Sequence, residues 1–241
     1  MSTRLDLRAA RILLLGLGLT NPLANPFVVA QEATKPAAAS ADKAVAEAIA
    51  AIKKMPGIAV QEKDGEVIAV DFRKCGDNWI DTFPRVLEIP TVQTISVSGP
   101  SATHSRIVSM KKLPNLRALR LEQAAITDET IAEVSQFPKL DDINLDRCGV
   151  TDECLKSLGQ SKTIKRIRAP RTKFSDTGLA YLKDTTQLEL LDLSDCNQIS
   201  DAGLVHLKGL TKMRNLSLWG PRITEDRKST RLNSSHEWIS R

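Results

Sequence analysis

Aromatic side chains are scarce in this sequence. Phe, Trp and Tyr together make up 4% of the 241 residues, whereas apolar residues as a whole make up 41%. The scarcity of rings argues against an interior built around them, and the apolar content favours a core of stacked aliphatic layers. The length allows one large domain or two small ones.

The sequence also lacks the motifs of common enzymes and metal sites. It has no glycine-rich phosphate loop and no nucleophile elbow. His104 and His206 stand without the second His or the spaced carboxylate that a zinc site or a catalytic triad requires. The spacing of Cys148 and Cys154 matches no metal-ligand motif. We therefore predict no enzyme activity, no catalytic residue, no cofactor and no metal.

A strong overall charge is absent once the two ends are set aside. The formal charge of the chain is +5. Residues 1–30 hold three Arg against one Asp, and residues 226–241 hold four basic residues against two acidic ones. The body is left at +1, so no overall field would recruit a polyanion, and we expect no nucleic-acid partner.

The apolar run near the N-terminus is too short to cross a membrane. Ile12–Leu19 holds eight residues, whereas a spanning helix needs roughly 20. Arginines before the run and small residues up to Ala30 after it predict a secretory signal peptide over 1–30. The mature chain is then secreted or periplasmic, with no integral membrane segment. Ala, Pro and Ser over 31–41 predict a linker.

The C-terminal stretch 226–241 matches neither a repeat nor a cap. Asp226 to His236 is the translation of one reading frame of a common short-read library adapter. We interpret 226–241 as an adapter-derived artefact tail and expect the natural chain to continue differently after Glu225. A natural basic tail is the alternative.

Residues 42–72 predict a helix followed by a β-hairpin. Apolar residues recur at helical spacing up to Pro56. The two strands of the hairpin are expected on either side of Asp64 and Gly65, whose types supply the positive-φ residues of a tight turn. We expect this unit to form an N-terminal cap.

The strongest pattern is a repeat of 24 or 25 residues. Apolar residues recur at positions i, i+3 and i+5, and each triplet predicts one strand. From the third triplet on, each strand is followed by Ser or Thr and then an acidic residue, which is typical of a helix start, with a hydroxyl cap and a carboxylate in the first turn. The triplets begin at Val67, Val92, Leu116, Leu140, Ile164, Leu188 and Met213, and the helix starts include Thr127-Asp128, Thr151-Asp152, Ser175-Asp176 and Ser200-Asp201.

The repeated pattern resembles the cysteine-containing subclass of leucine-rich-repeat proteins, of the exported bacterial type. The match covers about 91–225, with a looser first unit from 65, and Cys148 and Cys196 occupy the cysteine position of the pattern. The resemblance implies an α/β solenoid over 65–225, with parallel strands on the concave face, helices outside, and a protein-binding role. Stability then comes from stacking neighbouring units.

The four cysteines are not expected to form a bridge between repeats. Cys148 and Cys196 lie two repeats apart, roughly 10 Å at the strand spacing of a sheet, whereas bridged Cα atoms lie within about 7 Å. We predict that Cys148 is a buried turn residue that satisfies backbone groups. Cys154 replaces the Gly of other repeats at the helix start, and the pairing of Cys75 stays open.

Outward-facing residues of the strands should line the concave face, because side chains alternate along a strand. We predict that this face binds a protein or glycan ligand. The alternative is that opposite charges on adjacent strands neutralise one another. The predicted binding residues are Arg120, Asp142, Asn144, Asp146, Arg166, Arg168, Asp192 and Trp219.

The unit at 162–185 departs from the others. Ala169 replaces the last core Leu, and Pro170 removes a backbone donor after the strand. These changes indicate either a bulge shaped for a ligand or simple repeat drift. For the chain as a whole, the alternative to a binding module is a structural or recognition arm of a longer exported protein, with a C-terminal enzyme domain as one form of it.

Overall fold

A computed structural model describes residues 35–224 and 230–231. The predicted signal peptide lies outside the described residues, and so does the predicted artefact tail except for Thr230 and Arg231. Residues 1–40 and 41–241 form two units, and the second holds the sheet and its helices.

The predicted helix and hairpin precede the parallel strands, and the hairpin forms the first two strands of the sheet. Helix α1 spans Lys35–Lys53, and strands β1 (Ala59–Lys63) and β2 (Glu66–Asp71) pair antiparallel. Asp64 and Gly65 both have positive φ, as the hairpin prediction requires. The helix begins before the predicted start at Asp42, so the linker prediction is wrong over 35–41. Proline fits the first turn of a helix and alanine is the strongest helix former, which accounts for the earlier start.

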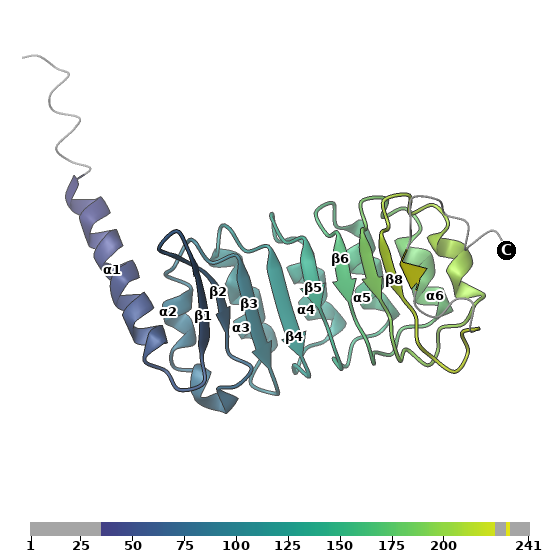
Figure 1. The fold of residues 1–241 in the computed structure, drawn as a ribbon, viewed down its shortest axis with the longest axis horizontal. Coiled ribbons are helices and arrows are strands. Elements are labelled where there is room, and N and C mark those ends of the chain that lie inside the picture. Colours follow the sequence, from purple (N-terminus) through teal and green to yellow (C-terminus); the bar gives the residue numbers. More distant parts are fainter. Residues whose placement is uncertain (1–34, 225–229, 232–241) are drawn as a thin grey trace, which may run out of the picture. The chain divides into compact units, whose positions relative to one another are not determined.

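The strands form one sheet in sequence order, β1 to β9 (Figure 1). Strands β2 to β8 are parallel, and β8 pairs antiparallel with β9 (Thr230–Arg231). Strand β6 pairs residue by residue with both neighbours, so the bulge proposed for the 162–185 unit is wrong and the unit keeps the regular ladder. The remaining parallel strands are β3 (Thr94–Ser98), β4 (Ala118–Glu122), β5 (Asp142–Asn144), β6 (Arg166–Arg168), β7 (Leu190–Asp192) and β8 (Asn215–Ser217).

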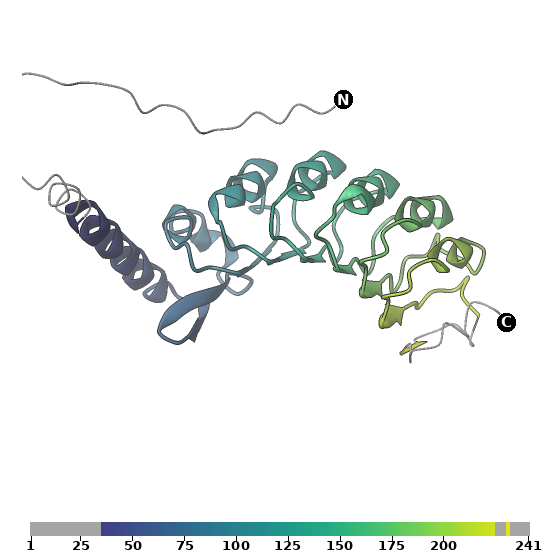
Figure 2. The ribbon, with the colours of Figure 1, turned by 90° about the horizontal axis from the view of Figure 1, so that it is seen from above.

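Helical segments cover one face of the sheet, on the outer side of its bend (Figure 2). Several are only one turn long and of the tighter 3-10 type. The helical segments that follow the hairpin are η1 (Gly76–Trp79), α2 (Phe83–Val86), α3 (His104–Ser109), η2 (Met110–Lys112), α4 (Asp128–Val134), α5 (Asp152–Gln160), α6 (Asp176–Leu179), η3 (Ala180–Leu182) and η4 (Gly203–Leu207). This strand-and-helix repeat confirms the predicted α/β leucine-rich-repeat solenoid.

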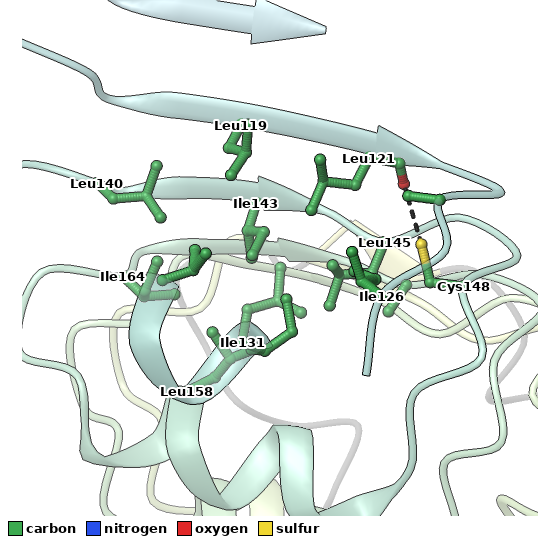
Figure 3. Packing of buried hydrophobic residues seen from close by; sticks show 14 of the residues in the cluster. Leu119, Leu121, Ile126, Ile131, Leu140, Ile143, Leu145, Cys148, Leu158 and Ile164 are labelled. Atoms are coloured by element: carbon green, nitrogen blue, oxygen red, sulfur yellow. Dashed lines mark hydrogen bonds between the residues drawn. The ribbon is translucent and has the colours of Figure 1, made fainter. Parts of the chain in front are cut away.

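The core is a set of aliphatic rows that run across the strands (Figure 3). Leu119, Ile143 and Ile167 are paired in register and fully buried. Stacking of this kind buries an aliphatic face that no single repeat could bury alone, which is why the repeats stabilise one another.

The cysteines belong to this core, and all four are free and buried. The Cys148 thiol donates to the carbonyl of Leu121 at 3.4 Å (Figure 3), which confirms the predicted turn role. The Cys196 thiol donates to the carbonyl of Ala169 at 3.3 Å. Burial raises the pKa of the Cys148 thiol to about 11, so these sulfurs satisfy backbone groups rather than react.

The aspartate at the start of α4, α5 and α6 acts between repeats, a role that the sequence pattern does not indicate. Asp152 accepts hydrogen bonds from the backbone N–H of Ser175 at 2.9 Å and from its hydroxyl at 2.6 Å. Asp128 and Asp176 bind the next repeat in the same way. The carboxylate therefore ties each helix start to the following one, in addition to any effect on its own helix dipole.

Replacing Asp152 with Ala is expected to lower the free energy of unfolding by about 1–3 kcal/mol, because two charge-assisted hydrogen bonds are lost. Glu153→Ala is the matched control, since Glu153 is exposed and contacts only Lys156 and its own helix, and it should cost less than about 0.5 kcal/mol. Urea unfolding followed by circular dichroism measures both. Equal effects of the two variants would contradict the inter-repeat role.

Candidate functional site

The sheet face opposite the helices carries the rows of outward residues that the sequence predicted. One row is Ala118, Asp142, Arg166, Leu190 and Asn215, and the next is Arg120, Asn144, Arg168, Asp192 and Ser217, each paired in register. Glu122 pairs with Ser98 in a third row. Beyond the strands, Gln123, Arg147, Arg171 and Asp195 have positive φ, and their backbone N–H groups donate to the next repeat.

Two adjacent carboxylates lie at the centre of this face, Asp141 and Asp142. Both residues are buried, and three arginines contact them. Arg166 bridges the pair, since its Nη2 donates to Asp141 and its Nε donates to Asp142 at 3.0 Å. Arg117 binds Asp141 at 2.8 Å, and Arg168 binds Asp142.

Electrostatic interactions hold this cluster of carboxylates and guanidinium groups together. Burial by itself lowers the pKa of Arg166, but the hydrogen bond to Asp142 and the charges of Asp141 and Asp142 outweigh it, so the pKa is raised. The guanidinium therefore stays charged, and its positive charge compensates the negative charges of Asp141 and Asp142. A buried carboxylate without such a partner is costly.

Two further arginines, Arg171 and Arg73, also form ion pairs with carboxylates. The Nε and Nη2 of Arg171 donate to the two carboxylate oxygens of Asp146, at 3.0 and 3.1 Å. Arg73 binds Asp71 and reaches Glu122 at 2.7 Å. Charge neutralisation between neighbouring repeats, the alternative we considered, therefore accounts for Asp142, Asp146, Arg166 and Arg168.

The other predicted binding residues are arranged differently. Asn144 accepts from the backbone N–H of Asp146 at 3.0 Å, and Asp192 accepts from Ser194. Trp219 is 55% exposed. The structure brings Arg120, Asp142, Arg166 and Arg168 together and places Trp219 at the far end of the parallel strands.

Arg120 is an exposed arginine of this face whose side chain makes no hydrogen bond or ion pair within the described residues. Its charge still acts on Asp71. Burial raises the pKa of that carboxyl, but the hydrogen bonds and charge of Arg73 together with the charge of Arg120 lower it below its ordinary value. The Arg120 guanidinium keeps its five donors available for a ligand.

A hollow of about 400 Å³ lies over β3 to β6 beside Arg120. Small side chains, Thr94 and Ala118, lie among the charged residues that line it. A second hollow, of about 240 Å³, adjoins it through Thr94 and Arg120 and extends over the hairpin. We call the two together the concave hollow. It offers charged and hydroxyl groups along a line across the strands, which suits an extended polar ligand.

His104 has partners that the sequence did not indicate. Its Nδ1 lies 3.1 Å from the Thr130 hydroxyl, and its Nε2 lies 3.6 Å from a carboxylate oxygen of Glu133. Thr130 is fully buried, so no substrate reaches its hydroxyl, and the trio connects two helix starts. Among the described residues no group of His, Cys, Asp and Glu could hold a metal ion. Nor does any helix of the described part have the length and apolar character to cross a membrane.

Comparison with known proteins agrees with the repeat. A family model described as a leucine-rich repeat matches residues 186–207, which include β7 and η4. No curated protein sequence matches the chain.

Solved structures show partial similarity. An internalin C2 from Listeria monocytogenes is 23% identical, with 56% of this chain and 54% of that chain covered and a TM-score of 0.42. An internalin (inlF) from the same organism is 18% identical, with 59% and 46% covered and a TM-score of 0.45. The structure of Rad7 and Elc1 from yeast is 14% identical, with 82% and 66% covered and a TM-score of 0.48. The chain spans about half the length of the two internalins.

Proposed function

We propose that this leucine-rich-repeat solenoid is a non-enzymatic binding module that recognises an extended protein segment through its concave face, outside the cytoplasm. Arg120 carries the proposal, because it is a guanidinium without an ion-pair partner in the described residues, beside a hollow of about 400 Å³. Arginine is a common anchor residue in protein interfaces. The location outside the cytoplasm is supported by the N-terminal signal pattern of the sequence.

The arrangement around Arg120 favours a ligand with a carboxylate or a backbone carbonyl at this point. The guanidinium presents a planar fork of donors that matches a carboxylate with two parallel hydrogen bonds. Asp142 and Arg166 line the same hollow and are already paired, so they shape its wall at no net local charge. Arg120 then supplies the attraction together with Lys165, which lines the same hollow.

The test is selection of random peptides displayed on phage against the immobilised full chain, followed by affinity measurement for the enriched peptides. We expect Arg120→Ala to weaken binding by roughly tenfold or more, since a hydrogen bond to a charged group contributes about 1.5–3 kcal/mol. Arg222→Ala is the control, because Arg222 is exposed and lies in the last repeat, outside both hollows. Peptides that bind wild type and the Arg120 variant equally would exclude this site.

A further inference from the structure

The edge of the sheet where the parallel strands begin carries a basic cluster. Four cationic residues precede β4, β5 and β6 in the sequence and line one hollow of about 470 Å³. These three strands lie side by side in the sheet (Figure 1). We call this set the basic rim: Arg117, Lys139, Lys162 and Lys165. The rim is not evident from the sequence, because its members come from three repeats.

The lysines of the basic rim lack acidic partners. Within the described residues, Lys139, Lys162 and Lys165 form no ion pair. Lys139 instead donates to the side-chain oxygen of Asn115 at 2.7 Å. The one carboxylate lining the hollow, Asp141, is already bound by Arg117 and Arg166. The hollow therefore presents an excess of positive charge, although the chain between its two ends is nearly neutral.

The rest of the hollow can bind a peptide backbone. Gln93, Asn115 and Thr163 line it and carry side-chain groups that donate and accept hydrogen bonds. No aromatic residue lines it, so it lacks the stacking platforms on which bases of single-stranded nucleic acids lie. The distance across three neighbouring strands is about 10 Å, which an extended peptide covers in about three residues.

We infer that the basic rim binds an acidic peptide segment, with carboxylates near Lys139, Lys162 and Lys165 and the backbone along the amide and hydroxyl groups. Arg120 does not line the hollow of the basic rim, although the two hollows share Gln93, Arg117, Asp141 and Lys165. The inference does not depend on the concave-face proposal.

The test uses a fluorescein-labelled octapeptide of alternating Glu and Ser, with a Gln–Ser octapeptide as its uncharged match. Anisotropy titration against the full chain should show binding of the Glu peptide that weakens with salt, as exposed charge pairs do. The triple variant Lys139→Ala, Lys162→Ala and Lys165→Ala should weaken it by about tenfold, from three exposed ion pairs lost together.

The matched control is Lys173→Ala, Lys183→Ala and Lys208→Ala, which removes the same charge from exposed lysines outside the hollow. This variant should bind the Glu peptide like wild type. Equal losses in the two triple variants, or no binding by wild type, would overturn the inference. So would a sulfated oligosaccharide or a single-stranded oligonucleotide of the same charge that binds the rim more tightly than the peptide. Arg120→Ala should leave this binding intact, which separates failure here from failure of the concave-face proposal.

Discussion

An Ile143→Ala variant is expected to lose about 3 kcal/mol of its free energy of unfolding, because truncating a buried Ile removes its transfer free energy and leaves a cavity. Ile143 is fully buried in β5 beside Leu119 of β4 (Figure 3), and it is in register with Leu119 on one side and with Ile167 on the other. A cavity there weakens the packing of three adjacent repeats, and in a stacked array stability depends on those interfaces.

Ile143→Val and Asn144→Ala calibrate this expectation. The Val variant keeps most of the side chain and should cost about 1 kcal/mol. Asn144 is the next residue on the same strand and is only half-buried on the opposite face, so its truncation should cost less than the loss of Ile143. Urea unfolding measured by circular dichroism and by Trp fluorescence gives the free energies and shows whether the transitions coincide. An Ile143→Ala cost near that of Ile143→Val would mean that the core rows do not couple the repeats.

The core rows were predictable because their signal is local. Apolar residues at fixed spacing predict each strand, as at Leu116, Leu119 and Leu121. Parallel stacking of repeats of nearly equal length then sets the register of the strands. The same logic gave the buried role of Cys148. The hairpin was predictable as well, because Asp64 and Gly65 have the residue types that a tight turn selects.

Features that depend on the neighbouring repeat were not predictable in the same way. The sequence places Asp152 at a helix start, but only the stacking distance shows that its carboxylate reaches Ser175. Turn residues such as Gln123 and Arg147 have positive φ without being Gly, so their residue types give no signal. Repeat drift accounts for Ala169, whose carbonyl accepts from Cys196 within a regular ladder.

The arrangement of the candidate site was likewise only partly predictable from the sequence. Alternation along the strands placed Arg120, Arg166 and Arg168 on one face correctly. It could not distinguish the arginines that bind Asp142 from the one that has no such partner, because pairing depends on rotamers and on distances across strands. For the same reason the sequence did not show that Asp141 and Asp142 are buried.

The cluster around those two carboxylates leads to the second large effect. Arg166→Met is expected to lower the free energy of unfolding by about 2 kcal/mol, since it removes hydrogen bonds to two charged groups. The side chains of Asp141 and Asp142 are only 9% and 10% exposed, so water cannot replace the lost guanidinium. Arg117 and Arg168 remain as partners, which keeps the cost below the 3–5 kcal/mol of a fully broken buried pair. Methionine retains the apolar stem, so the loss reports on charge rather than on packing.

Asp142→Asn should cost less than Arg166→Met, and this asymmetry is the sharper test. The side chains of Arg166 and Arg168 are each 33% exposed, so they reach water when the carboxylate is removed, and Arg166 keeps Asp141. In the double variant, the carboxylate of Asp142 and the guanidinium of Arg166 that neutralises it are removed together. The combined loss in the free energy of unfolding should therefore fall below the sum of the two single losses. A double-mutant cycle from urea unfolding at neutral pH measures this coupling. Additive costs would show that Arg166 and Asp142 contribute independently, and the cluster would then be a set of surface pairs of little energetic weight.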